Sequence, residues 1–187
     1  MATRQGKTLL TRADWTRAAL EAMAAGGTNA VAVDRIAKTL GASRGSFYWH
    51  FTDRQDLIDA ALTLWEQENT TEFAAEVIAA GEPIDQLRYL LREVYEKPVD
   101  TIEITLASAG DDPLVAAAFA RVTGRRLDYL RGIFSGMGFD DEESHSRAWL
   151  VYAFYLGHHE LGRNAGAARR RPADLDRIIG LLGSGPH

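Results

Sequence analysis

The sequence predicts an all-α fold, in which a small N-terminal helix-turn-helix precedes a larger helical body. Apolar residues recur at helical spacing along most of the 187 residues, and no useful length of chain shows the alternation typical of a strand. Gly and Pro residues stand between these apolar segments, where helices are expected to end or begin. Because 46% of the residues are hydrophobic, the chain can bury the core of one ordinary domain or two small ones.

The first helix is expected to run from about Thr11 to Ala25. Thr11 can cap its first turn, and Asp14 supplies an acidic residue where the helix dipole favours one. Trp15 and Leu20 belong to its apolar face, and a Gly-Gly pair follows its last turn.

Two short helices joined by a tight turn are expected next, over residues 33–40 and 44–50. Gly41 can adopt the left-handed conformation that ends the first, and the Ser43 hydroxyl can cap the second. Apolar side chains on both helices, Phe47 among them, would hold the pair together. The second helix carries many donors and flat rings, as a helix that enters the major groove of DNA requires. The pattern therefore predicts a helix-turn-helix that binds double-stranded DNA.

A longer helix, capped by Asp53, is expected to run to Ala80 and to belong to both parts of the molecule. We place the domain boundary inside it, between residues 1–57 and residues 58–187. The remaining helices are expected over residues 83–97, 99–109, 113–136, 148–165 and 174–182.

Charge is distributed unevenly along the chain, whose net charge is −5. Residues 1–55 carry 8 of the 21 basic and 4 of the 26 acidic residues, so the remainder carries 13 basic and 22 acidic residues. A basic head on an acidic body directs phosphate attraction to one end. The chain has no Cys, no apolar leader and no apolar stretch that could span a bilayer, so we expect a cytoplasmic protein without a membrane partner.

The stretch from Ile36 to Leu57 resembles the TetR (tetracycline-repressor) family of bacterial regulators, most specifically in its Tyr48-Trp49-His50-Phe51 run with Arg54 following. The resemblance implies a homodimer whose two heads bind a palindromic DNA operator. It also implies a body, residues 58–187, that holds a small-molecule effector and makes the dimer. The expected function is a ligand-responsive regulator, most often a repressor that a small apolar effector releases. The alternative is a DNA-binding regulator or activator without an effector.

The resemblance also assigns roles to residues of the head. Arg44 and Ser46 would face bases or their flanking phosphates, and an Arg can read guanine with two hydrogen bonds. The expected DNA-binding residues are Lys38, Ser43, Arg44, Gly45, Ser46, Tyr48, Trp49, His50 and Arg54. The chain departs from the family at Ala32, where a Ser or Thr usually caps the next helix. Lys38 or Arg35 would have to compensate, or the affinity for DNA would be lower.

For the effector, the sequence offers aromatic residues at helical spacing, which are usually core, and Glu103 within an apolar run. Glu103 would either orient a polar or cationic ligand or lie at the surface. The expected ligand-binding residues are Trp65, Tyr89, Glu103, Phe119 and Trp149.

The helix over residues 148–165 is apolar on two faces, which predicts that one of them meets a second subunit. The expected dimer residues are Tyr152, Tyr155, His159, Leu175, Ile178, Ile179 and Leu182. We expect no metal, because the run His158-His159-Glu160 lacks the H-E-x-x-H spacing. We also expect no cofactor and no enzymatic activity, because no nucleophile stands with a base.

Overall fold

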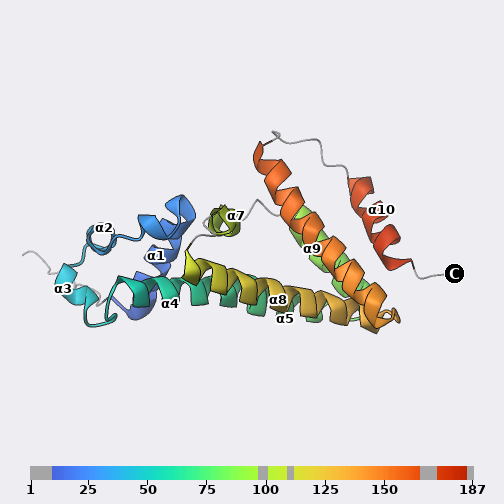
Figure 1. The fold of residues 1–187 in the computed structure, drawn as a ribbon, viewed down its shortest axis with the longest axis horizontal. Coiled ribbons are helices and arrows are strands. Elements are labelled where there is room, and N and C mark those ends of the chain that lie inside the picture. Colours follow the sequence, from blue (N-terminus) through green and yellow to red (C-terminus); the bar gives the residue numbers. More distant parts are fainter. Residues whose placement is uncertain (1–9, 97–100, 109–111, 165–171, 185–187) are drawn as a thin grey trace, which may run out of the picture.

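The computed structural model describes residues 10–96, 101–108, 112–164 and 172–184, and in that part of the chain every regular element is helical (Figure 1). The all-α prediction is therefore confirmed. The elements are α1 (Arg12–Gly26), η1 (Thr28–Ala30), α2 (Val33–Thr39), α3 (Arg44–Phe47), α4 (Arg54–Glu66), η2 (Gln67–Glu72), α5 (Phe73–Ile78), α6 (Pro83–Glu96), α7 (Thr101–Ser108), α8 (Pro113–Gly136), α9 (Asp141–Asn164) and α10 (Pro172–Gly183).

Helix α1 begins as the sequence predicts. The Thr11 hydroxyl accepts a hydrogen bond from the Asp14 amide at 3.3 Å, and the Asp14 carboxylate accepts one from the Thr11 amide at 2.7 Å. Two otherwise unpaired amides are thereby satisfied within one turn. The hydrogen bond from the Thr11 backbone is the main reason that the pKa of Asp14 lies below its ordinary value.

The turn between α2 and α3 also forms as predicted, with Gly41 at a φ of 64° and the Ser43 hydroxyl accepting from the Ser46 amide at 3.2 Å. Helix α3 is nevertheless shorter than the predicted 44–50, because it ends at Phe47. The next amides bond only three residues back, as His50 does to the Phe47 carbonyl at 2.9 Å. This tighter turn carries the chain to Phe51, which is buried in the core.

The predicted helix from Asp53 to Ala80 is continuous to Ile78, but its middle is different. Asp53 caps α4 by accepting from the Asp56 amide at 2.9 Å. The six residues of η2 then form a π-helical turn before α5 continues. A π turn has one residue more than an α turn, and such turns are frequent at functional sites.

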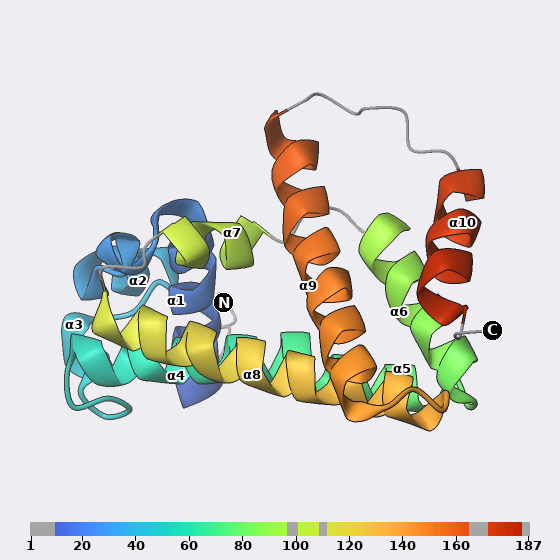
Figure 2. The same ribbon diagram turned by 45° about the vertical axis from the view of Figure 1, so that its right-hand side comes forward.

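Two apolar clusters form the core, and Figure 2 shows α8 running between the parts that contain them. The first cluster contains residues from the four helices α1, α2, α3 and α4, from α7 and from the start of α8. It includes Trp15, Phe47 and Trp65. The second cluster joins the end of α8 to α5, α6, α9 and α10, and includes Leu91 and Phe134. The N-terminal helices therefore share their core with α7 and α8.

Helices α9 and α10 lie at the end of the molecule opposite α3 in both views (Figures 1 and 2). Helix α9 begins seven residues before the predicted Ala148, at Asp141. Its Arg147 donates hydrogen bonds to the carbonyls of Leu182 and, at 3.1 Å, Ser184 at the C-terminal end of α10. A cation at a helix C-terminus satisfies carbonyls that lack partners and complements the helix dipole, so Arg147 links α9 to the C-terminal end of α10, which packs beside α6 (Figure 2).

Candidate nucleic-acid interface and ligand pocket

The α3 end of the molecule presents the polar and aromatic residues that the sequence predicts there. Phe47 anchors α3 from beneath, with its ring 5.5 Å from that of Trp15 and 5.5 Å from that of Phe51. On the outer side, the side chain of Trp49 is 79% exposed, which is unusual for so large an apolar group. Of the predicted DNA-binding residues, Lys38, Ser43, Arg44, Gly45, Tyr48, Trp49 and Arg54 are exposed, while Ser46 and His50 are half-buried.

Arg44 projects from the first turn of α3 and is only loosely held. Its Nη1 lies 3.5 Å from Oδ2 of Asp34, and both side chains are mostly exposed. The side chain of Tyr48 and then the charge of Asp34 raise the pKa of Arg44. An exposed ion pair of this kind contributes little to stability, so the guanidinium can exchange Asp34 for another anion at low cost.

Arg54 is exposed, but its guanidinium group is hydrogen-bonded to backbone carbonyls of the protein. Its Nε donates to the Val31 carbonyl at 2.7 Å, and its Nη2 donates to the Thr28 carbonyl. These bonds tie the start of α4 to the chain just before α2, whose first residue follows Ala32 without any side-chain cap. The structure therefore gives Arg54 a positioning role that the sequence did not predict, and the missing cap at Ala32 is confirmed.

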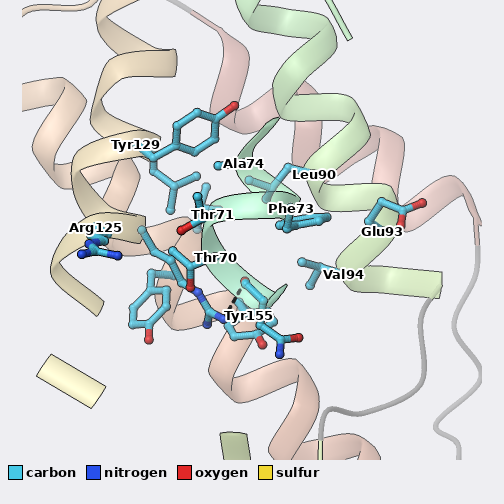
Figure 3. Close-up of a pocket in the computed structure, with 15 residues that line it drawn as sticks. Thr70, Thr71, Phe73, Ala74, Leu90, Glu93, Val94, Arg125, Tyr129 and Tyr155 are labelled. Carbon is cyan, nitrogen blue, oxygen red and sulfur yellow. Dashed lines mark hydrogen bonds between the residues drawn. The ribbon is translucent and has the colours of Figure 1, made fainter. Parts of the chain in front are cut away.

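A pocket of about 320 Å³ opens in the body, between η2, α5, α6, α8 and α9 (Figure 3). Figure 3 shows Thr70 between Arg125 on one side and Phe73 and Val94 on the other. Its volume is at the lower end of the range for small-molecule sites. The residues that line it are Asn69, Thr70, Thr71, Phe73, Ala74, Leu90, Glu93, Val94, Arg125, Arg126, Tyr129, Leu130, Val151, Tyr152 and Tyr155.

None of the five predicted ligand-binding residues lines this pocket, and their role in ligand binding stays a prediction. Trp65 is fully buried in the first core cluster, and Phe119 packs against the same cluster. The Tyr89 hydroxyl bonds to Glu76 at 3.3 Å, and Trp149 is exposed on α9. Glu103 is buried and does not line the pocket, but it is bonded to Arg126, which does.

Those partners form a buried charged cluster. Nη1 of Arg126 donates to both carboxylate oxygens of Glu103, at 2.6 and 2.8 Å, and the Tyr155 hydroxyl also donates to Glu103. Both side chains of the ion pair are largely shielded from solvent. Burial is the largest single effect on Arg126 and lowers its pKa, but the charge of Glu103, its hydrogen bond and the neighbouring tyrosines together outweigh burial. The net shift of the Arg126 pKa is therefore upward, and the guanidinium stays charged.

The π turn η2 supplies the part of the pocket wall formed by residues 69–71. The sequence did not predict this part, because no local residue pattern marks a π turn. Nη2 of Arg126 donates at 3.1 Å to the Asn69 carbonyl, inside η2. Two threonine hydroxyls in α1 and α4 donate to the carbonyl four residues back: Thr16 to Arg12 at 3.0 Å and Thr63 to Asp59 at 2.8 Å. The buried Thr70 hydroxyl, inside the π turn, has no hydrogen-bond partner among the residues that the structure describes.

Thr70→Val is therefore expected to raise the melting temperature by about 2–4 °C, because it removes a buried hydroxyl that pays a desolvation cost without a bond. Thr16→Val is the matched control, since both threonines are 7% exposed and only Thr16 is bonded. That control is expected to lower the melting temperature. Thermal unfolding of the two variants measures this difference, and equal shifts would contradict the interpretation.

The predicted dimer residues lie mainly inside the protomer, and their part in a subunit contact stays a prediction. Tyr152, Leu175 and Ile179 are buried in the second core cluster, and Tyr155 lines the pocket. Ile178 and Leu182 are partly buried against the same cluster, and the His159 side chain lies outside the described residues. Among the side chains that the structure describes, the large apolar ones that α9 and α10 expose are Trp149, Leu150 and Leu181.

The comparisons with known proteins agree with this arrangement. Residues 16–61, which span most of α1 to α4, match the family model "Bacterial regulatory proteins, tetR family". A stretch of 77 residues is 36% identical to the HTH-type transcriptional regulator AcrR of Shigella flexneri; it is 39% of this chain and about a third, 34%, of that protein. Over the residues that the structure describes, no helix is both long and apolar enough to cross a membrane.

The whole fold is also that of solved TetR-family structures. A TetR-family transcriptional regulator from Agrobacterium tumefaciens has a TM-score of 0.70 at 18% identity, covering 92% of this chain and 95% of its own. E. coli NemR in its reduced form has a TM-score of 0.75 at 13% identity, covering 91% and 94%. The N-terminal segment of this chain therefore matches the TetR family model, and the chain as a whole has the fold of solved TetR-family regulators.

Proposed function

We propose that this protein is a repressor that binds a palindromic operator as a homodimer and that a small molecule in the pocket releases it. The observation that carries the proposal is one continuous helical stretch, Arg54–Ile78, with the head at one end and the pocket wall at the other. Arg54 holds the segment before α2, and Asn69 to Thr71 line the pocket. Movement of η2 on ligand binding would therefore be transmitted to the helix-turn-helix.

Side-chain contacts support coupling between η2 and the head. Both carboxylate oxygens of Glu68 accept from Arg17 of α1, one of them at 2.8 Å. Coupling is reciprocal, so a ligand that weakens operator binding must itself bind more weakly to the operator complex, typically by about 1–3 kcal/mol. A ligand that binds without any effect on operator affinity would instead favour the alternative, a regulator without effector control.

The head is expected to lose operator affinity when Arg44 is replaced by Ala, by about 1–3 kcal/mol if it reads a base. The operator is first identified by selecting, from a pool of random DNA duplexes, those that the protein binds. Fluorescence anisotropy then measures the affinity of each variant for that duplex at two salt concentrations. Arg88→Ala is the control, because Arg88 is an equally exposed arginine that is paired with Asp85 on α6, in the body. Equal affinities of the two variants would refute the proposed interface.

Gly45 gives a second, independent test of the same surface. A Cβ at this position would meet only the Ser43 hydroxyl, at 3.8 Å, so the fold itself leaves room for alanine. Gly45→Ala is expected to keep or slightly raise stability, since alanine is the better helix former, yet to weaken operator binding if the duplex approaches the α3 backbone. Thermal unfolding and anisotropy measured on the same sample separate these effects.

The dimer is proposed to form through α9 and α10, at the end away from α3. Trp149, Leu150 and Leu181 are large apolar side chains of these two helices that are at least half exposed, and exposed apolar surface of this kind supports an interaction site. Hydrogen bonds from Arg147 link α9 to the end of α10. A two-fold axis at this end would leave both heads free to meet adjacent half-sites. The domain division at residue 57 likewise remains a proposal.

A further inference from the structure

We propose that the pocket takes an uncharged, largely apolar molecule, and that Glu103, a positioning residue behind the wall, excludes anions by holding Arg126. The inference rests on the proposed effector role of the same pocket and adds the chemical class of its ligand. It follows from the partners of the tyrosine hydroxyls and of the two arginines in the wall.

The tyrosine hydroxyls of the wall already have partners within the protein. The Tyr129 hydroxyl donates to Gln86 at 3.3 Å, and that of Tyr152 lies 3.0 Å from the Thr123 hydroxyl. The Tyr155 hydroxyl donates to Glu103. Burial raises the pKa of Tyr129 to about 12 and is the main reason that the pKa of Tyr152 is raised too. These phenols therefore stay neutral, and the wall offers a ligand mostly carbon.

The charges in the wall are also compensated. Nη1 of Arg126 donates to both carboxylate oxygens of Glu103 and Nη2 donates to the Asn69 carbonyl, so the charge of Arg126 is already compensated within the protein. Arg125 is mostly exposed and pairs with Glu66 at 2.6 Å. The Glu93 carboxylate is directed away from the centre of the group of residues drawn in Figure 3.

A charged ligand would have to disturb the buried pair. A carboxylate in the pocket would compete with Glu103 for Arg126, and a cation would compete with Arg126 for Glu103. Either exchange leaves one buried ion without its partner, which is costly because the interior solvates ions poorly. An uncharged molecule loses little water on entry and leaves the pair intact, so binding selects for it.

The test uses four probes of one shape: propylbenzene, 4-propylphenol, 4-propylbenzoate and (4-propylphenyl)methylammonium. Isothermal titration of the full chain at neutral pH gives their affinities. We expect both neutral probes to bind and both ions to bind at least about tenfold more weakly, since each ion disturbs the pair. A wild-type protein that binds the benzoate as tightly as the phenol, or that binds none of the four, overturns the proposal.

Glu103→Gln tests the role of Glu103 directly, because it keeps the shape and removes the charge that compensates Arg126. The benzoate is expected to gain at least about tenfold in affinity relative to propylbenzene, because Arg126 now needs an anion. Glu66→Gln is the matched control, since it uncovers Arg125 at the exposed rim. An equal gain in the control, or none in Glu103→Gln, refutes the role of Glu103. If Glu103→Gln does not fold, the wild-type series decides the ligand class alone.

Operator affinity measured with each probe separates this inference from the proposed function. A neutral probe that binds selectively but leaves operator affinity unchanged refutes effector control and leaves the ligand class standing. A charged probe that binds best and releases the operator refutes the inferred ligand class and supports effector control.

Discussion

Replacing Arg126 by methionine is expected to lower the free energy of unfolding by about 3–5 kcal/mol, because it leaves the buried Glu103 carboxylate without its cation. Glu103 accepts two hydrogen bonds from Arg126 in the folded protein, and its side chain is only 3% exposed. The Tyr155 hydroxyl remains, but one neutral donor does not replace a guanidinium. Chemical denaturation, with the midpoint and slope compared to those of the unaltered protein, measures the loss.

Two further variants decide whether the loss comes from the buried charge. Arg126→Met combined with Glu103→Leu is expected to recover most of the stability, because replacing both partners of a buried pair by apolar groups is often neutral. Arg88→Met breaks the exposed pair with Asp85 and is expected to cost at most about 1 kcal/mol. If Arg126→Met costs no more than Arg88→Met, or if the double variant is the least stable, the interpretation of the cluster is wrong.

Replacing Leu181 by glutamate is expected to give a monomer and to lower operator affinity about a hundredfold or more, because the two half-sites are then bound separately. The Leu181 side chain is 77% exposed on α10, so the charge leaves the core of the protomer intact. Leu150→Glu on α9, where the side chain is 61% exposed, is expected to act in the same way. Sedimentation velocity and operator anisotropy on the same samples measure both effects.

Ile78→Glu is the matched control for this prediction. Ile78 is also a large apolar side chain that is more than half exposed, but it lies at the end of α5, outside α9 and α10. It is expected to leave both the oligomeric state and operator affinity unchanged. A dimer that survives Leu181→Glu and Leu150→Glu together would place the subunit contact elsewhere.

The helix starts and the N-terminal turn could be predicted from the sequence because their signals are local. Thr11 and Asp14 satisfy each other's amides within one turn, and Gly41 and Ser43 act within two residues of the bend that they form. Such contacts need no distant partner, so the same residues dictate the same geometry wherever the helix packs. The helix-turn-helix and its exposed outer face followed from these signals.

The pocket and the free apolar surface were decided only by the tertiary structure. Periodicity predicted apolar faces on α9, but whether Tyr152 or Leu150 faces outward depends on where α8 and α6 lie. Glu103 looked the same in sequence as a surface carboxylate until Arg126, 23 residues later, became its partner. The π turn at Asn69 and Thr70 receives contacts from α1 and α8, which are distant in the sequence. Local chemistry therefore determined the helices and the head, whereas long-range packing determined which side chains surround a cavity and which remain free.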